Sequence, residues 1–582
     1  MAERDPTCIG RVRHVLGATV TVALDPDLAG VAPIWRGRLV PVGQVGSLVR
    51  FPQGPVSLVG SVVLVGIAQL ADPLPPSQAP QQGDRWLQVQ LLGEIDGLNA
   101  FQRGISTYPG LDDPVHFTTP DELVAIYPPP GPERVVVGGL SAAPDVPVAL
   151  DAARLVTRHS AVVGSTGSGK TSAVASLLQS FISGGWASAN IVLVDPHGEY
   201  ASSLGATAAT RSVRGEGDTL LRVPAWALPA SDLLFTLTGL DGKTIVDRFS
   251  ELVTAERRAF AADAEWLDVG TESINADTPI PFDLRRVWHR LDYDNRATVT
   301  QKTGGTDCVE DNGDPKTLTP ARFTPYGPMA GEPVQCLTYH YYSPAPERLR
   351  LRLSDPQFDF FLEPPDPACP DPLVAMVSEW LGNKLPVSVL DFSGVPAEVA
   401  DVAIGVVLQL LFEIATRSNE DGIGRKRPVL VVLEEAHRYL GSEASAHAAR
   451  TATNRIAREG RKYGVGLMLV TQRPSELPDT ALAQCGTIVA LRLTNGSDQA
   501  TVRTTLPDAV SGLASVLPSL RTGEALISGE AVVLPTRILI RRPEPEPHAG
   551  DPSLAGWRVS PSIDNDLTAV IARWRGLSEG TS

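Results

Sequence analysis

One stretch constrains the fold of this chain more than any other, the glycine-rich sequence from Gly164 to Thr171 (GSTGSGKT). The short apolar run 160–163 precedes it, and residues 171–183 follow with the pattern of a helix. In a strand–loop–helix unit of this kind, successive backbone N–H groups and the positive end of the helix face one point. The spacing G-x-x-x-x-G-K-[ST] therefore predicts a phosphate-binding loop with a nucleoside triphosphate as its ligand.

The residues of this loop have separate predicted tasks. Lys170 is expected to reach the β- and γ-phosphates, and the Thr171 hydroxyl to hold Mg²⁺. The alternative, a chance glycine-rich turn, does not account for the agreement between the spacing and the flanking elements. We expect ATP to be bound by Gly164, Ser165, Thr166, Gly167, Ser168, Gly169, Lys170, Thr171 and Ser172.

Apolar runs separated by helical segments recur along the chain, and they predict an α/β fold with a mostly parallel sheet and helices on both faces. In such sheets the ligand lies at the carboxyl ends of the strands. Four polar residues directly end or follow apolar runs there: Asp195, Glu434, Glu435 and Gln472.

Hydrolysis of the β–γ bond needs a metal, a positioned water and cations. We assign Glu434 to the metal shell, Glu435 to the water, and Gln472 to sensing the γ-phosphate. The plainer interpretations are an acidic helix start for the glutamates and an ordinary strand-end residue for Gln472. Asp195 is a weaker candidate for the same water network. His197 is weaker still, because a histidine in a turn is as often only hydrogen-bonded to backbone.

A basic helix is predicted from about residue 448 to 463. Arg455, Arg458 and Lys462 share one face of it, and Arg461 lies one step around. One interpretation is a solvated basic face. The other is an arginine offered to the γ-phosphate of a neighbouring subunit, which requires an oligomer.

Composition sets the wider limits. The 582 residues carry a net charge of −16, which argues against a general basic coat for nucleic acid but not against a local basic surface. Five cysteines lack C-x-x-C spacing, so neither a disulfide framework nor a zinc site is predicted. Without a run of 18 apolar residues or a signal-peptide pattern, we expect a cytoplasmic protein.

The order of patterns along the chain predicts its domains. Short strands before residue 70 and around 86–92 predict a small β-barrel, and 109–130 is interpreted as a loop that joins it to the nucleotide domain. Residues 300–345 are interpreted as an extended polar excursion. The predicted ranges are 1–130 for the barrel and linker, 131–200 for the first part of the ATPase core, 201–385 for a helical insertion, 386–545 for the second part of the core, and 546–582 for a C-terminal tail.

Taken together, several motifs resemble the HerA family of hexameric DNA-translocating ATPases, within the larger group that includes the FtsK pumps. Besides the phosphate loop, the matching stretches are Arg158-His159, 195–200 (DPHGEY), 433–437 (LEEAH), 458–462 (REGRK), 471–474 (TQRP), the N-terminal stretch 10–22, and the closing 523–529 with Pro535. The pair Glu434-Glu435 departs slightly from the Asp-Glu that is commoner in the family. The match is thin over 201–385.

The resemblance implies a RecA-like core, a homo-hexameric ring with ATP sites between subunits, and double-stranded DNA in the central pore. It suggests that Arg158 and Arg461 help to complete the site, one or both from a neighbour. It also implies a separately encoded partner docked at the N-terminal barrel, a NurA-type nuclease or, in anti-phage defence, a sirtuin-type NAD hydrolase or another effector.

Two functional hypotheses follow from these observations. The first is an ATP-driven motor on duplex DNA that feeds a partner nuclease in end processing or defence. The second is an ATP-binding ring scaffold that organises an effector with little translocation. A membrane-linked conjugation pump ranks last, because no membrane-spanning segment is predicted.

Overall fold

A computed structural model describes residues 5–26, 34–35, 38–40, 42, 44–66, 85–381, 384–420, 422–441, 446–506, 508–548, 557–558, 567 and 570–571. The chain divides into two compact units, Met1–Pro547 and His548–Ser582. Most of the predicted C-terminal tail, 546–582, lies outside the described residues.

The centre of the first unit is an eleven-stranded sheet in the order β11-β10-β24-β23-β22-β12-β21-β20-β13-β19-β14. The seven strands from β22 to β14 are parallel, and the four at the other end are antiparallel. The predicted mostly parallel sheet is thus confirmed. The parallel strands are β12 (Ser160–Val163), β13 (Asn190–Asp195), β14 (Ala208–Ser212), β19 (Val387–Asp391), β20 (Val429–Leu433), β21 (Val465–Thr471) and β22 (Thr487–Ala490). The antiparallel strands are β10 (Arg134–Leu140), β11 (Ala143–Asp151), β23 (Glu524–Gly529) and β24 (Thr536–Ile540).

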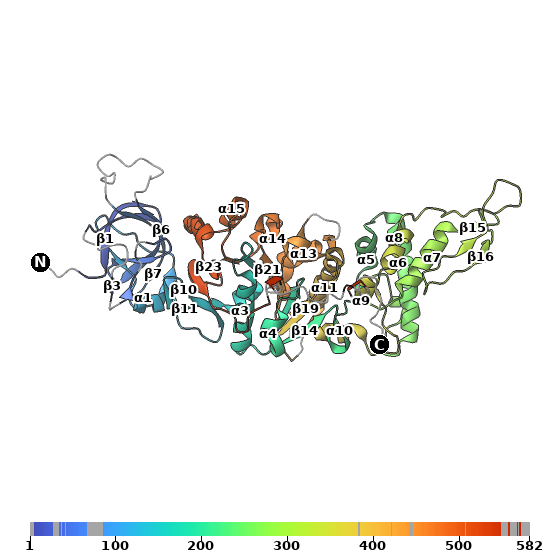
Figure 1. Ribbon diagram of the computed structural model, residues 1–582, viewed down its shortest axis with the longest axis horizontal. Coiled ribbons are helices and arrows are strands. Elements are labelled where there is room, and N and C mark those ends of the chain that lie inside the picture. Colours follow the sequence, from blue (N-terminus) through green and yellow to red (C-terminus); the bar gives the residue numbers. More distant parts are fainter. Residues whose placement is uncertain are drawn as a thin grey trace. The chain divides into compact units, whose positions relative to one another are not determined.

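Helices cover both faces of this sheet (Figure 1). Alternate residues of β12 show why, because Ala161 and Val163 belong to one buried cluster and Val162 to another. The first cluster contains the apolar sides of α11 and α13, and the second contains that of α3. The helices of the core are α2 (Ala152–Thr157), α3 (Lys170–Ser183), α4 (Ala201–Leu204), α11 (Ala397–Arg417), α12 (His437–Leu440), α13 (His447–Tyr463), α14 (Asp479–Ala483) and α15 (Gly496–Thr505).

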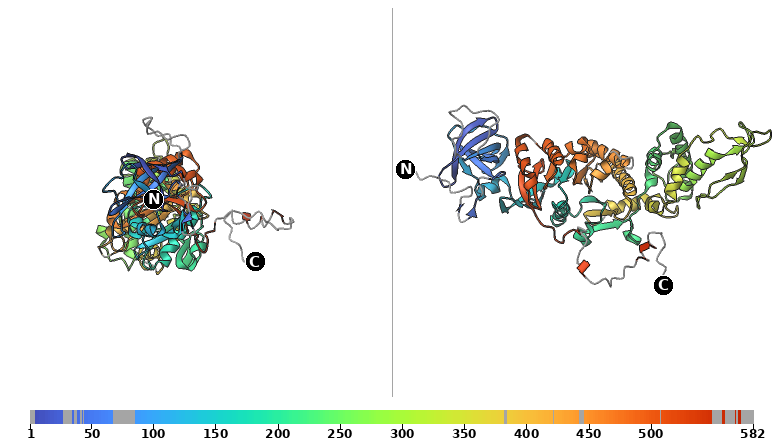
Figure 2. Two further views of the ribbon diagram at one scale, coloured as in Figure 1. Left: turned by 90° about the vertical axis from the view of Figure 1, so that its left-hand side faces the viewer. Right: turned by 45° about the horizontal axis from the view of Figure 1, so that its top comes forward.

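The N-terminal strands form a closed barrel, as predicted (Figure 2). Its order is β2-β1-β9-β5-β6-β7, and the pairing of β2 with β7 closes the ring, with β8 added beside β7. The strands are β1 (Cys8–Leu16), β2 (Thr19–Leu24), β5 (Leu48–Gln53), β6 (Val56–Gly66), β7 (Trp86–Ile95), β8 (Phe101–Arg103) and β9 (Pro114–Phe117); β3 (Ile34–Trp35) pairs with β4 (Arg38–Leu39) separately.

The interpretation of residues 109–130 as a loop is wrong. This segment contains β9, which closes the barrel between β1 and β5, and the helix α1 (Pro120–Ile126). The helix is specified locally by a capping box, in which Thr119 and Glu122 bond each other's backbone N–H, and by Pro120 at its first position. A four-residue strand that begins with proline gives little periodic signal.

The segment predicted as a helical insertion contains helices, but most of its residues lie outside them. Its helices are α5 (Ala230–Thr238), α6 (Lys243–Asp263), α7 (Leu284–Arg296), α8 (Ala345–Leu353), α9 (Asp359–Leu362) and α10 (Pro372–Trp380). The excursion at 300–345 contains one short antiparallel ladder, β16 (Val309–Asp311) with β17 (Arg322–Phe323), and its strand β18 (Val334–Gln335) pairs with β15 (Thr298–Val299) just before it. The first part of the core reaches beyond the expected residue 200, because β14 is the edge strand of the central sheet.

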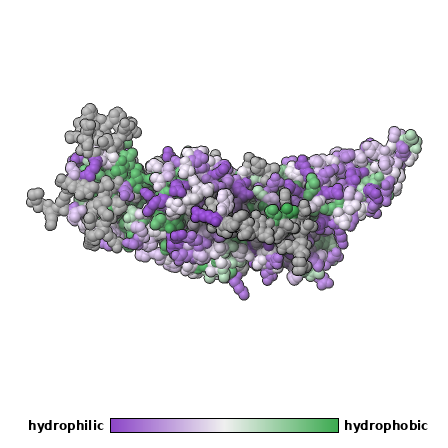
Figure 3. Space-filling view, viewed as in Figure 1, coloured by the Kyte–Doolittle hydropathy of each residue, from purple (hydrophilic) through white to green (hydrophobic). Residues whose placement is uncertain are grey.

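One of the described helices, α11, is long and apolar enough to cross a membrane, with a mean hydropathy of 1.9, but 78% of the tested stretch is buried inside the fold. That burial is typical of a core helix. On the face shown in Figure 3, apolar side chains gather in small groups among larger hydrophilic areas.

Candidate active site

The glycine-rich loop connects β12 to α3, and its backbone is folded back on itself. Gly167 and Gly169 have positive φ values of 71° and 96°, which side-chain-bearing residues rarely adopt. A Cβ on Gly164 would lie 2.5 Å from Ser168 Oγ, so only glycine fits there. The Gly164 N–H donates to the Thr471 carbonyl at 3.2 Å, and this bond ties the loop to β21.

The side chains of the loop differ in their burial and in their contacts. Lys170 and Ser168 are buried, and Ser168 Oγ has no hydrogen-bond partner among the described residues. Ser165 Oγ lies 3.2 Å from Thr494 Oγ1. Ser172 follows Thr171 in the first turn of α3. A buried orphan hydroxyl and an inward lysine beside free backbone N–H groups are the donors that a phosphate requires.

Gln472 lies over this loop. The Thr166 hydroxyl donates to its Oε1 at 2.6 Å. Because β21 lies directly beside β12 in the sheet, the residue after β21 meets the loop after β12. Gln472 is therefore placed to contact whatever the loop binds.

Thr171 has a partner that the sequence analysis did not assign. Its hydroxyl donates to Glu199 Oε2 at 2.9 Å. Glu199 lies in the turn after β13, and Asp195 builds that turn by accepting backbone N–H groups from His197, Gly198 and Tyr200 at 3.1, 2.8 and 3.1 Å. The stretch DPHGEY contains Glu199, but a glutamate four residues past a strand carries no signal of its own.

Asp195 is thus an organiser of the turn. It has no exposed surface, and both of its carboxylate oxygens are occupied by backbone N–H groups. His197, the weaker candidate, is exposed in the same turn.

Glu434 is buried beside the loop. It is 2% exposed, and it accepts a hydrogen bond from the Tyr200 hydroxyl at 2.7 Å. Burial raises the pKa of Glu434 to about 8, while the Tyr200 hydrogen bond and the charge of Lys170 oppose the rise. A cation close to this carboxyl group would favour its ionised form.

Glu435 has a strained backbone, with φ of 49°. A non-glycine residue in the left-handed region costs about 1–3 kcal/mol and persists only when its surroundings impose it. The next N–H, that of Ala436, donates to the Val470 carbonyl at 2.9 Å and fixes the turn. The Glu435 side chain is mostly buried, and its Oε2 has no hydrogen-bond partner among the described residues.

Arg158 and Arg461 lie on the opposite edge of the sheet from this site. Arg158 precedes β12 and Arg461 precedes β21, whereas the loop and Gln472 follow the same two strands. The four residues of β12 alone span roughly 13 Å. Neither arginine can reach a phosphate in the loop of its own chain.

The two arginines share a basic depression of about 400 Å³ at that edge. Its cationic lining consists of Arg154, Arg158, Arg425, Arg461 and Lys462. Arg158 Nη1 lies 3.4 Å from Glu530 Oε2 and is one-third exposed. An exposed pair of this kind contributes little energy, so Arg158 is available to another anion.

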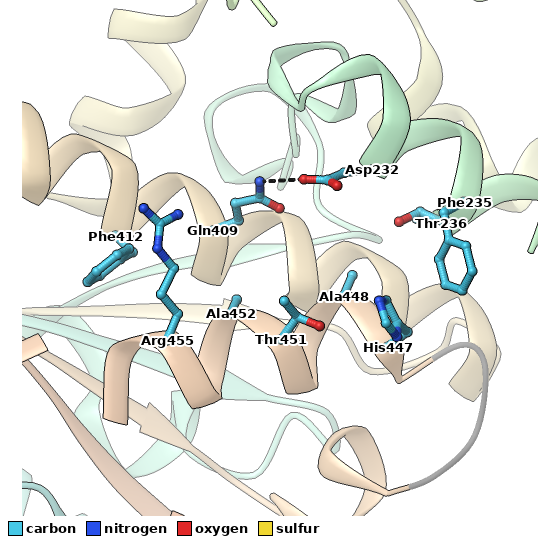
Figure 4. A pocket seen from close by; sticks show the side chains of 10 residues that line it. All are labelled: Asp232, Phe235, Thr236, Gln409, Phe412, His447, Ala448, Thr451, Ala452 and Arg455. Carbon is cyan, nitrogen blue, oxygen red and sulfur yellow. Dashed lines mark hydrogen bonds between the residues drawn. The ribbon is translucent and has the colours of Figure 1, made fainter. Parts of the chain in front are cut away.

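The basic helix does not act as one face. Arg455 donates to Glu413 on α11 at 2.5 Å and lies over the Phe412 ring, so it joins two helices of the core. Beside it, α5, α11 and α13 enclose a cavity of about 150 Å³ (Figure 4). Gln409 donates to Asp232 across the opening, and the small side chains of Ala448 and Ala452 leave the space.

His159, next to Arg158, belongs to one of the matching motifs, and in the structure its ring bonds two neighbouring elements. Its Nδ1 accepts from the Leu467 N–H at 3.1 Å, which leaves Nε2–H to donate to the Ala457 carbonyl at 3.1 Å. Burial lowers the pKa of His159, so the neutral ring links β12 to both β21 and α13.

The residues present fit a nucleotide with Mg²⁺. No group of three or more His, Cys, Asp or Glu side chains able to hold a metal occurs among the described residues. Mg²⁺ is usually held by one or two protein oxygens together with phosphates and water. Thr171 and Glu434 are the residues that would hold it, with Glu199 behind the threonine.

Comparison with known proteins agrees with these features. The family described as "Helicase HerA, central domain" matches residues 135–411, and the one described as "Helicase HerA-like C-terminal" matches 384–537. The DNA double-strand break repair helicase HerA of Pyrococcus furiosus is 26% identical over 492 residues, which cover 78% of this chain and 76% of that protein. The protein of the same name from Sulfolobus acidocaldarius is 37% identical over 176 residues, 30% of this chain and 35% of the relative. Among solved structures, VirB4 of Thermoanaerobacter pseudethanolicus aligns with a TM-score of 0.44 at 13% identity, covering 71% of this chain and 97% of the other.

Proposed function

Since the chain belongs to the HerA family of P-loop ATPases, we propose that it is an ATP-driven translocase of duplex DNA that works as a ring. The observation that carries the proposal is the division of the site between two edges of the sheet. The phosphate loop, Glu435 and Gln472 lie at the carboxyl edge, and the basic depression lies at the amino edge. A complete site then needs two copies.

In this proposal the near half of the site binds and orients the nucleotide. The loop and Lys170 hold the phosphates, Glu435 polarises the attacking water, and Gln472 senses the γ-phosphate. Mg²⁺, when bound, neutralises charge on the β- and γ-phosphates, and Thr171 and Glu434 hold it. Arg158 or Arg461 of the next copy stabilises charge that develops during bond breaking, which is worth about 10³–10⁵ in rate for such arginines.

The DNA substrate and the partner protein are inferred from the family to which the chain belongs. The relatives are named as DNA double-strand break repair helicases, which supports duplex DNA as the substrate. We place the DNA in the pore of a homo-hexamer, and a NurA-type nuclease or a defence effector at the N-terminal barrel. The identity of the partner determines whether the complex serves repair or anti-phage defence.

Complementation between subunits tests the proposal. Glu435→Gln lacks the water-polarising carboxylate but keeps its arginines, and Arg461→Ala lacks the arginine but keeps an intact loop. Each is expected to be inactive alone, and a mixture of the two is expected to regain hydrolysis at sites where the intact loop meets the intact arginine. Arg455→Ala is the matched control on the same helix and keeps the parental rate.

Two outcomes would contradict the proposal. If the mixture stays as inactive as its components for both Arg461→Ala and Arg158→Ala, the site is not shared. If hydrolysis ignores duplex DNA and no displacement along DNA occurs, while a co-purified partner changes the rate, the scaffold alternative is favoured.

A further inference from the structure

His437 lies between Glu435, which polarises the attacking water in the proposed function, and Thr471, which directly precedes Gln472. Its Nδ1 is 3.2 Å from Glu435 Oε2 and 3.0 Å from Thr471 Oγ1. The side chains of His437 and Glu435 are only 10% and 12% exposed. Thr471 is the last residue of β21, directly before Gln472.

We propose that His437 is a positioning residue that orients the Glu435 carboxylate toward the attacking water. The inference rests on the proposed function, because it takes Glu435 to be the water-polarising group. It extends that function to a residue for which neither the motif nor the plain strand-end argument gives a role.

The position of the ring proton decides whether His437 can hold Glu435. A carboxylate only accepts hydrogen bonds, so His437 can hold Glu435 only through Nδ1–H. In the other tautomer an unprotonated nitrogen would face the carboxylate at 3.2 Å, and Glu435 Oε2 would have no prospect of a donor from His437. The Thr471 hydroxyl oxygen already accepts the Arg473 N–H at 3.0 Å and has a second lone pair for the same Nδ1–H.

The backbone conformation between Glu435 and His437 brings their side chains together. Glu435 has φ of 49°, and α12 begins at His437, so the tight turn brings the ring back over the carboxylate. The Thr471 carbonyl accepts the Gly164 N–H of the phosphate loop. One side chain therefore connects the turn that carries Glu435 to the strand that fixes the loop and carries Gln472.

The contact is close but not locked. The two atoms lie 3.2 Å apart, but they do not form a hydrogen bond, and Glu435 Oε2 has no hydrogen-bond partner among the described residues. Catalytic hydrogen bonds are often long or misaligned before the substrate is bound, and they tighten in the complex. Burial lowers the pKa of His437, so a neutral ring with one placed proton is the form that acts.

The test compares variants of the full-length chain by steady-state ATP hydrolysis and nucleotide binding. His437→Ala is expected to lower kcat about a hundredfold, the effect of misplacing a reacting group by about 1 Å. KM, the affinity for ADP and the melting temperature are expected to stay at the parental values. His437→Asn, which keeps a donor near the position of Nδ1, recovers most of kcat.

One further variant tests for a merely structural role. Thr471→Val keeps the shape but removes the hydroxyl, and it lowers kcat in the same way by a smaller factor. His447→Ala, a histidine at the edge of the cavity in Figure 4, is the matched control and keeps the parental kcat.

The results of these assays distinguish a failure of the proposed role of Glu435 from a failure of the proposed role of His437. If Glu435→Gln hydrolyses ATP at the parental rate, the proposed role of Glu435 fails and the inference fails with it. If Glu435→Gln is inactive but His437→Ala keeps the parental kcat, only the inference is overturned. A loss of ADP affinity equal to the loss of kcat also overturns it.

Discussion

At the scale of single residues, the site depends on where protons are placed. The Thr171 hydroxyl has one proton, and it points to Glu199 at 2.9 Å, which leaves the oxygen lone pairs free for a metal. The Tyr200 hydroxyl donates a hydrogen bond to Glu434 Oε2. The turn built by Asp195 therefore supplies one contact to each of the two residues that would hold the metal in the proposed function.

This arrangement predicts that Glu199 sets the affinity for Mg²⁺. Glu199→Gln weakens the Mg²⁺-dependent part of nucleotide binding about 10- to 100-fold, the effect of losing a group behind a metal ligand. Titration of a fluorescent ADP with Mg²⁺ and with a chelator measures it. Binding without metal should stay unchanged, and His197→Ala, in the same turn, is the control. Equal losses with and without Mg²⁺ would show that Glu199 only supports the fold.

At the scale of elements, the antiparallel end of the sheet is joined by one buried carboxylate. Glu524 of β23 has no exposed side-chain surface and accepts two hydrogen bonds from Arg537 of β24, at 2.8 and 2.9 Å. The Ser141 hydroxyl between β10 and β11 donates to the same carboxylate. Burial opposes ionisation of Glu524, but these bonds outweigh it and lower its pKa to about 2.

A pH dependence of stability follows. Because the pKa of Glu524 in the fold lies below its usual 4.5, its contribution is present above that value and is lost as the pH falls toward about 2. The shift corresponds to a contribution on the order of 3 kcal/mol. Glu524→Gln should be less stable than the parent in urea at neutral pH, and this difference should shrink at about pH 3. A difference that does not change with pH would contradict the assignment.

The elements also show what the sequence could predict. The phosphate loop, the parallel strands and the polar residues at their ends were predictable because spacing and strand direction alone bring them to one edge. The strand β9 and helix α1 were missed because each is too short to show a period, and β14 because five residues at an edge resemble a loop. The pairing of Arg455 with Glu413 and the contacts of Glu199, His159 and His437 depend on tertiary packing, to which a sequence pattern gives no access.

At the scale of the whole first unit, the barrel and the amino edge of the sheet meet at one loop. Arg103 of β8 donates to the carbonyls of Gly529 and Val533 at 3.0 and 2.5 Å, and also to that of Val532. Glu530, in the same loop, is the partner of Arg158. A barrel side chain thus holds the loop that holds an arginine of the basic depression.

This connection predicts the effect of removing Arg103. Arg103→Ala leaves three carbonyls without their donor and should cost about 1–3 kcal/mol of local stability. Hydrogen exchange of the backbone amides at 529–533 should speed up accordingly, and Arg103→Lys should lie in between because an ammonium group lacks the fork that spans several carbonyls. Arg13→Ala, which removes only an exposed pair with Asp112, should leave this exchange unchanged. If exchange at 529–533 is the same in Arg103→Ala as in the parent, the loop is held by the core alone, and the barrel has no mechanical connection to Arg158 through it.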